Sequence, residues 1–207
     1  MTIVRHPPIA ELRDDACLAY ANTLSWRGRE APLEALGDFG DLLQWAAGSV
    51  GLAAEVVGEL ESWAHQRPAM AAELFAEAIA LREVIYRILS TLASGDSVSD
   101  QDLAALNRGL AAAPPRQRLA RSEAGYGWQN EPAPLSAATL LAPVLWSASD
   151  LLASDRRRRV RLCANEPCLW LFLDQSKAGT RRWCAMAACG NRAKARRHYR
   201  RTRRPGG

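Results

Sequence analysis

Four of the five cysteines lie between residues 163 and 189, in two matched pairs. The pattern is Cys163-x4-Cys168, fifteen intervening residues, and then Cys184-x4-Cys189. Structural zinc needs four ligands in a tetrahedron, usually supplied as two pairs that each lie on a tight turn. The spacing therefore predicts one structural Zn²⁺ ion, and this constrains the fold of the region more than any other feature.

Other interpretations of the four cysteines are weaker. Four unrelated buried thiols would not need paired spacing, and the spacing matches neither common ferredoxin arrangement of an iron–sulfur cluster. A catalytic metal is disfavoured because four cysteines leave no coordination position for water. His198 lies too far past Cys189 to be a good ligand. The opening segment, MTIVRHPPIAELRDD, lacks the apolar run of a signal peptide, and no apolar run is long enough for a membrane span. We therefore expect a soluble intracellular protein whose clustered cysteines are metal ligands and not disulfides.

The residues around the cysteines support a small metal-stabilised fold. Asn165 and Pro167 are turn formers inside the first pair. Residues 169–173 alternate as a short strand would, with Trp170 and Phe172 on one side as candidates for the finger core. Gly190 would permit a positive φ that aims amide groups at a thiolate. A region this small builds little apolar core, so we expect the metal to supply much of its folding free energy.

The charge divides at the same place as the cysteines. Residues 1–155 carry 11 Lys and Arg against 20 Asp and Glu, a net charge of −9. Residues 156–207 carry 16 against 2, a net charge of +14. Such asymmetry predicts two domains, 1–155 and 156–207, of which the second attracts polyanions. A solvated basic tail is the alternative that charge alone leaves open.

The chain after Gly190 predicts a basic helix. On a helical projection, Arg192, Arg196, Arg200 and Arg203 fall within an arc of about 80°. A helix charged all round cannot pack on a core, and we expect it to become ordered on contact with a polyanion such as duplex DNA. Some arginines could instead offset the charge of the zinc–thiolate centre. Charge does not separate DNA from RNA. The predicted nucleic-acid contacts are Arg181, Arg182, Arg192, Lys194, Arg196, Arg197, Arg200, Arg201, Arg203 and Arg204.

The first 155 residues are predicted to be mainly helical. Leu12, Cys17, Tyr20 and Leu24 recur at helical spacing, as do apolar residues in later segments. A short hairpin is predicted over 116–131, with Gly125 in its turn. Further helices are predicted over 38–48 with Asp38 as cap and Gly48 as stop, over 68–93, after a Ser99 cap, and over 134–154 with a break at Pro143. The predicted fold class is α+β: a mostly helical N-terminal body with a small β-hairpin, followed by a small zinc finger ending in a basic helix.

The cysteine region resembles a known family. The segment RLCANEPCLWLFLDQSKAGTRRWCAMAACGNRAKARRHYRRTR is similar to the CGNR zinc finger, whose tetrapeptide is Cys189-Gly190-Asn191-Arg192 here. The upstream segments CLAYANTLSWRG and LLQWAAGSVGL resemble the ABATE domain, which precedes this finger in bacterial stress-response transcription regulators. The resemblance implies an α+β body, a zinc-bound finger and a DNA-binding regulatory role.

The body offers no catalytic group with a partner. His6 and His65 are isolated, Cys17 lies on an apolar helix face, and no phosphate-binding glycine loop is present. We therefore expect no enzyme activity. The ABATE resemblance suggests a sensing role in which Asn22, Arg27 and Trp45 line a ligand pocket, although caps and core packing explain each of them singly.

These features predict a cytoplasmic, nucleoid-associated transcription regulator. Its body would bind a small-molecule effector or form a homodimer, and its zinc finger would bind duplex DNA. Two alternatives stay open. One is a small-molecule-binding or enzymatic body with a zinc-stabilised anchor, and the other is an RNA-binding module.

Overall fold

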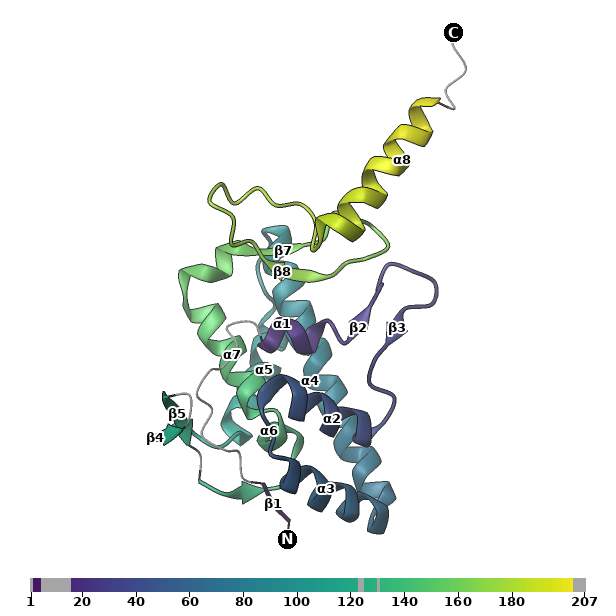
Figure 1. Ribbon diagram of the computed structural model, residues 1–207. Coiled ribbons are helices and arrows are strands. Elements are labelled where there is room, and N and C mark those ends of the chain that lie inside the picture. The colour runs from purple at the N-terminus through teal and green to yellow at the C-terminus, as the bar shows by residue number, and fades with distance from the viewer. Residues whose placement is uncertain (1, 5–15, 123–124, 130, 203–207) are drawn as a thin grey trace.

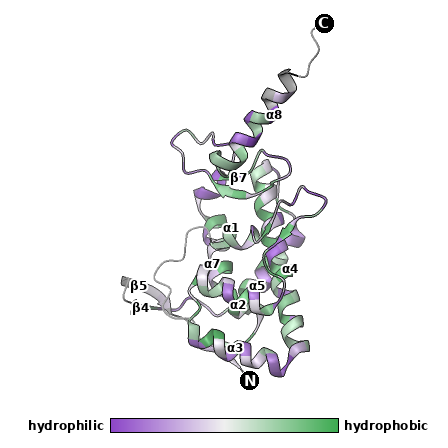
Figure 2. Ribbon diagram, turned by 45° about the vertical axis from the view of Figure 1, so that its right-hand side comes forward, coloured by the Kyte–Doolittle hydropathy of each residue, from purple (hydrophilic) through white to green (hydrophobic). Residues whose placement is uncertain are grey.

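Helices dominate the computed structural model, which describes residues 2–4, 16–122, 125–129 and 131–202 (Figure 1). The centre of the body is α4 (Pro68–Ser94), a 27-residue helix. The other body helices are α1 (Ala16–Ala21), α2 (Phe39–Val50), α3 (Ala54–Gln66), α5 (Asp100–Ala112), α6 (Ala137–Leu140) and α7 (Ala142–Ala153). Of these, α1, α2, α3, α5 and α6 contact α4. In Figure 2 hydrophobic residues gather along body helices such as α1 and α7. None of the helices in the described ranges combines the length and apolar character needed to cross a membrane.

The strands are short, and each described sheet is an antiparallel pair. In the body the pairs are β1 (Ile3–Val4) with β6 (Ala133–Pro134), β2 (Leu24–Ser25) with β3 (Leu33–Glu34), and β4 (Arg118–Ser122) with β5 (Gly125–Gln129). In the cysteine region β7 (Val160–Leu162) pairs with β8 (Leu171–Leu173). The predicted α+β class is therefore confirmed, and β4–β5 is the hairpin expected over 116–131.

Cap residues set several helix boundaries as predicted. The Asp38 carboxylate accepts the amide of Asp41 at 2.9 Å at the start of α2. Ser99 caps α5 in the same way, through the amide of Asp102. The expected stop at Gly48 is wrong, because α2 continues to Val50. The helix ends where Gly51 adopts φ of 74°, a left-handed conformation that costs glycine little.

The first predicted helix is shorter than expected. Leu12 lies outside the described residues, and α1 ends at Ala21. Leu24 is therefore not helical, which corrects the prediction; it pairs with Glu34 in the β2–β3 ladder. The chain turns at Thr23, whose hydroxyl donates to the carbonyl of Tyr20 at 2.8 Å. Such a local side-chain bond competes with continuation of the helix.

Among the remaining body helices, one prediction is confirmed and one helix was not predicted. The break at Pro143 is confirmed, because α6 ends at Leu140 and α7 restarts with Pro143 in its first turn. Helix α3 was not anticipated from the sequence. Only Val57 and Leu60 are fully buried on it, so its apolar pattern is sparse.

A buried ion network fixes the segment between α1 and α2 against α4. The side chain of Arg82 is only 2% exposed, and its guanidinium lies 2.7 Å from Glu34 and 2.9 Å from Glu83. Arg82 also donates to the Thr23 hydroxyl, and Arg27 pairs with Glu83 at 2.7 Å. A buried guanidinium needs such partners to offset its lost hydration. The network therefore holds the β2–β3 segment on α4.

The cysteine region, called the finger below (residues 156–202 of the described chain), begins with η1 (Asp155–Arg159), a 3₁₀ helix, and ends with α8 (Asn191–Thr202). Val160 and Leu171 are buried in the same apolar core as the body helices. Phe172, opposite Arg161 in the ladder, is instead buried among the cysteines. Because side chains alternate along a strand, β8 places one face on the body and the other on the cysteines. The predicted boundary between residues 155 and 156 stays a prediction, but the two parts share packed surface.

Candidate metal centre and nucleic-acid interface

The first cysteine pair lies on the loop that connects β7 and β8. The amide of Cys163 donates to the carbonyl of Trp170 at 2.9 Å, and the amide of Cys168 donates to the carbonyl of Asn165 at 2.6 Å. The second bond closes a tight turn, which brings the two sulfurs of the pair together. The predicted strand is shorter than expected because Leu169 has φ of 51°. Trp170 is 38% exposed and is not part of the finger core, whereas Phe172 is 7% exposed and belongs to it.

The second pair lies just before α8 in the chain. Cys189 is in η2 (Met186–Gly190), a single π-helical turn whose last two amides donate to the carbonyl of Ala185. The predicted positive φ at Gly190 is wrong, because Gly190 belongs to this helical turn and not to the left-handed residues. Gly190 lies against the Met186 side chain, since an added Cβ would lie 2.4 Å from the Met186 sulfur, so a larger residue would require that side chain to move. A bond of 2.8 Å from the amide of Ala164 to the carbonyl of Arg182 joins the two halves of the finger.

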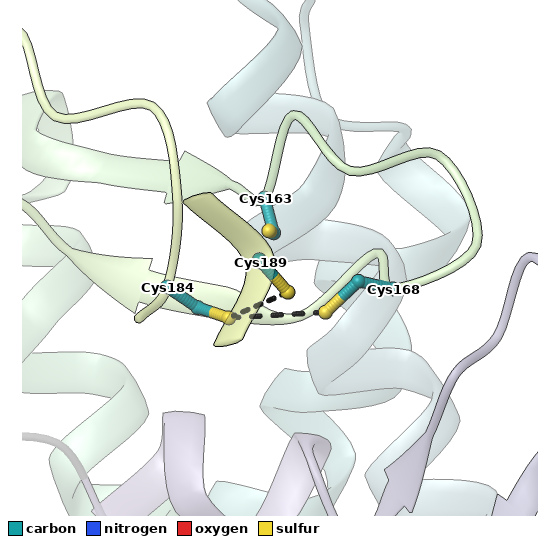
Figure 3. Close-up of side chains that lie close together, drawn as sticks. All are labelled: Cys163, Cys168, Cys184 and Cys189. Carbon is teal, nitrogen blue, oxygen red and sulfur yellow. Dashed lines mark hydrogen bonds between the residues drawn. The ribbon is translucent and has the colours of Figure 1, made fainter. Parts of the chain in front are cut away.

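The four sulfurs of Cys163, Cys168, Cys184 and Cys189 meet in one cluster (Figure 3), all within 4.8 Å of one another. The Cys168 and Cys184 sulfurs are 3.8 Å apart, and those of Cys184 and Cys189 are 3.7 Å apart. A Zn–S bond of about 2.3 Å places tetrahedral sulfurs roughly 3.8 Å apart. The donor set and its spacing therefore fit one zinc ion, with every protein ligand position filled.

The chemistry of the thiols also fits a cation. Burial raises the pKa of Cys168 to about 12 and also raises the pKa of Cys184. Burial acts in the same direction on Cys189, but hydrogen bonds from the neighbouring thiols and from Asn165 lower its pKa below the usual value. Thiolates are the form of cysteine that binds metals. A divalent ion would therefore displace the thiol protons and neutralise the negative charge of the closely spaced thiolates.

Polar groups around the cysteines connect the site to α8. The Asn165 amide donates to the Cys189 sulfur at 3.4 Å, and its carbonyl oxygen accepts a hydrogen bond from Arg196. Asn165 therefore orients a ligand and at the same time holds the second turn of α8. The Arg181 guanidinium donates to the carbonyls of Trp183 and Cys184 and lies 4.7 Å from the ring centre of Phe172.

The body contributes directly to this site. Asn22, which is buried, donates to the carbonyl of Leu171 at 2.8 Å and accepts its amide at 3.0 Å. The Tyr86 hydroxyl donates to the carbonyl of Leu169 at 2.9 Å. Gly28 lies so close to the first cysteine loop that an added Cβ would be 2.1 Å from the Glu166 carbonyl oxygen. The body therefore holds β8 and contacts the first cysteine loop at its middle and at its C-terminal end.

Trp26 extends the body contact to the base of α8. Its indole packs against the cysteine cluster, and the guanidiniums of Arg192 and Arg29 lie 4.8 and 3.9 Å from the ring centre. Trp26 has φ of 56°, and Leu169 across the interface is the other described non-glycine residue with positive φ. Left-handed backbone costs such residues roughly 1–2 kcal/mol each. Contacts on both sides of the interface therefore stabilise two unfavourable conformations.

The residues predicted to bind a ligand have structural contacts. Asn22 joins the body to β8, as described above. Arg27 forms a two-bond ion pair with Glu83 and stacks on Tyr86 at 3.8 Å. Trp45 packs on Tyr20, with ring centres 4.8 Å apart. Two cavities among the described residues are lined by other side chains, one between α2, α3 and α4 and another between α4, α5 and α6. A ligand-binding role for the three residues stays a prediction.

The predicted nucleic-acid contacts fall into three groups. Arg192, Lys194 and Arg196 are exposed on the first half of α8 (Figure 1). Arg181 and Arg182 are exposed on the loop before Cys184, where Arg182 lies 5.5 Å from the Trp183 ring. The side chains of Arg197, Arg200 and Arg201 on α8 are not described, and Arg203 and Arg204 lie outside the described residues. Their contacts with nucleic acid stay predictions.

The sequence analysis missed several residues that build the site. Trp26, Gly28 and Tyr86 contact the finger from positions more than 80 residues away in the chain. No local pattern marks such pairs. Asn165 was recognised as a turn former, but its bonds to Cys189 and Arg196 depend on the folded finger.

Two family models match the chain. A model named ABATE, described as "Putative stress-induced transcription regulator", matches residues 14–155. The CGNR zinc finger model matches residues 159–202, which include all four clustered cysteines. A search of curated proteins found no match. Both matches agree with the resemblances seen in the sequence, and the second identifies the sulfur cluster as the site of one zinc ion.

Proposed function

The chain belongs to the ABATE family and carries a CGNR zinc finger, and from this premise we propose that it is a DNA-binding transcription regulator. In this proposal the zinc ion fixes the start of α8, and α8 binds duplex DNA. The body, residues 1–155, is a sensor or dimerisation domain, and residues 156–207 are the DNA-binding domain. Both matched families are regulator and zinc-finger types, and we assign the chain no catalytic role. It would act at the nucleoid.

One observation carries the proposal: α8 projects away from the body while its first turns are anchored to the zinc site (Figure 1). Its main contact within the described chain is with η2. Arg192, Lys194 and Arg196 are exposed along it. A basic helix anchored in this way can enter a major groove. There arginine side chains can bind guanine edges, and they can also bind the flanking phosphate oxygens.

The distribution of charge supports the same partner. The C-terminal segment 156–207, which contains the finger, has a net charge of +14, and the body has a net charge of −9. Their opposite signs direct a polyanion to the finger and away from the body. The contacts that Arg181 makes with the finger itself leave α8 as the main candidate surface.

Binding of the zinc-loaded protein to duplex DNA tests the proposal. We expect affinity to fall with salt, with a log–log slope of about −0.9 for each phosphate contacted. Lys194→Gln removes one exposed charge from α8 and should reduce that slope by up to about 0.9. Arg121→Gln is the matched control, because Arg121 is an exposed arginine on β4, at the opposite end of the molecule from α8 (Figure 1).

The results separate the alternatives. A slope near zero for the wild type would rule out binding through the basic helix and favour a body function with a zinc-stabilised anchor. Tighter binding to structured RNA than to duplex DNA under the same salt would favour an RNA-binding module. Equal effects of Lys194→Gln and Arg121→Gln would show that α8 is not the contact surface.

A further inference from the structure

A basic cavity of about 330 Å³ lies on the finger, apart from α8. It is formed where η1 meets the turn that follows β8. Its lining includes three basic side chains, from Arg156, Arg159 and Lys177, and one acidic side chain, from Asp174. The remaining lining is Leu173, Gln175 and Ser176.

The carboxylate of Asp174 is hydrogen-bonded within the turn. Asp174 is 1% exposed, and its carboxylate accepts the Ser176 amide at 3.0 Å, the Ser176 hydroxyl at 2.6 Å and the Arg181 amide at 3.0 Å. These hydrogen bonds, of which the one from the Ser176 side chain has the largest effect, keep the pKa of Asp174 below its usual value. The carboxylate therefore stays ionised and holds the turn, while three cations against one anion leave the cavity basic.

Arg159 is held in place at the cavity. Its Nη1 donates to the carbonyl of Ser176 at 3.1 Å, and the guanidinium lies against Gly179, where an added Cβ would be 2.6 Å from Nη1. A guanidinium has five N–H donors, so this bond leaves others for an oxyanion. Lys177 is exposed on the same turn and adds a second cation. A fixed guanidinium beside an ammonium is suited to phosphate oxygens.

The cavity lies at the same end of the molecule as α8. Figure 1 shows the η1–β7 region and α8 at the finger end, opposite α3 and the β4–β5 hairpin. We propose that the cavity formed by Arg156, Arg159 and Lys177 binds a backbone phosphate of the DNA that α8 contacts. This inference rests on the proposed function and adds a second contact to it. A phosphate held here would restrict how the finger can rotate about α8 on the duplex.

The first experiment measures duplex affinity over a salt series with the zinc-loaded full chain. Lys177→Gln and Arg159→Gln should each reduce the log–log slope by up to about 0.9 relative to the wild type. Lys177→Gln is the more direct test, because Arg159 also holds the Ser176 carbonyl. Arg121→Gln, which makes the same charge change on the β4–β5 hairpin, should leave the slope unchanged.

The second experiment tests the cavity without DNA. Inorganic phosphate is titrated into the isotope-labelled protein, with sodium chloride at equal ionic strength as control. The amide resonances of Ser176, Lys177 and Gly179 should shift saturably with phosphate only, and Lys177→Gln should weaken the response.

Each combination of results decides the inference. A slope for Lys177→Gln equal to that of Arg121→Gln overturns it, even where duplex binding itself upholds the proposed function. If phosphate binds the turn but the slope does not change, the ligand is free phosphate and the DNA contact is wrong. If the wild type does not bind duplex DNA at all, the proposed function and the DNA contact both fail, and the phosphate titration then shows only whether the cavity binds free phosphate. Slope and resonance changes together support the inference.

Discussion

Helices α7 and α8 each contain 12 residues, but their surroundings are opposite. Most of α7 is buried, including Leu145 and Trp146. On α8 the described residues Arg192, Lys194 and Arg196 are exposed. Burial of apolar side chains stabilises α7 by roughly 1.5–3 kcal/mol for each large residue. None of the described side chains of α8 is fully buried, so the contacts of this helix at the zinc site decide whether it forms.

The comparison shows that the two helices depend on different parts of the molecule. The fold of α7 depends on the core that it shares with α1 and α5. The fold of α8 depends on Cys189 before it, on Trp26 under Arg192 and on Asn165 beside Arg196. The predictions below act on one helix and spare the other.

Zinc removal should have the largest effect. Structural zinc in small finger peptides contributes about 10–16 kcal/mol of apparent binding free energy. We expect chelation, or Cys184→Ser, to unfold the cysteine loops and α8 while α7 and the other body helices remain. Elemental analysis should show the loss of one zinc per chain, and amide exchange should show the loss of protection in the cysteine loops and α8 but not in α7.

Cys17→Ala is the matched control for that experiment. Cys17 is buried in α1 and does not belong to the sulfur cluster. The variant should keep one zinc per chain and a protected α8. Loss of zinc in this variant, or its retention in Cys184→Ser, would contradict the assigned ligand set.

The next largest effect should come from shortening a core side chain of α7. Leu145 is 0% exposed, so Leu145→Ala should lower the free energy of unfolding by about 2–5 kcal/mol. Lys194→Ala on α8 should change it by less than about 0.5 kcal/mol, because Lys194 is exposed. Denaturant unfolding measures both. A large loss for Lys194→Ala would mean that α8 packs more tightly than its exposure indicates.

Asn22→Ala should cost about 2 kcal/mol. The change leaves the buried amide and carbonyl of Leu171 without partners, and each unpaired group is costly. Resonances of β8 and of the first cysteine loop should shift, while those of α7 should not. Gln44→Ala, which removes an exposed amide bond to Glu61, is the control and should be nearly neutral.

Trp26→Ala should have a smaller effect, about 1 kcal/mol, concentrated at the base of α8. The change removes the ring that lies under Arg192 and Arg29. We expect faster amide exchange in the first turn of α8 and faster zinc transfer to a chelator. Tyr126→Ala, an exposed aromatic change on β5, should alter neither rate. Unchanged rates in Trp26→Ala would show that Trp26 does not stabilise the helix.

Lowering the pH should reduce the stability of the body through protonation of Glu34 and Glu83. Burial acts to raise the pKa of each carboxyl, but hydrogen bonds and charge from Arg82 and Arg27 outweigh it and leave both pKa values lowered. A lowered folded pKa gives stability that is present above the unfolded value and is lost as pH falls through the folded value. Unfolding free energy should therefore decrease below about pH 5. Arg82→Met should flatten this dependence, and a pH profile parallel to the wild type would contradict the assignment.

Local patterns predicted the elements that depend on neighbours in sequence. Asp38 and Ser99 act as caps, Pro143 interrupts a helix, and paired cysteines converge on one ion, because each signal operates within a few residues. Two of the errors occurred where a distant segment makes contact. Leu24 leaves the helical pattern because the Arg82 network holds β2–β3 on α4. Trp170 is exposed because Leu169 is left-handed, with its carbonyl bound by Tyr86.

The sequence by itself determined that the chain has a helical body, four metal ligands and a basic segment after Gly190. Composition and short spacing are sufficient for such features because a turn, a cap or a ligand pair is a local property. Only the tertiary structure decided that Asn22, Trp26 and Tyr86 of the body hold the finger and the base of α8. Those contacts join residues that are far apart in the chain, and they form only when apolar burial of β7 and β8 brings the two parts together.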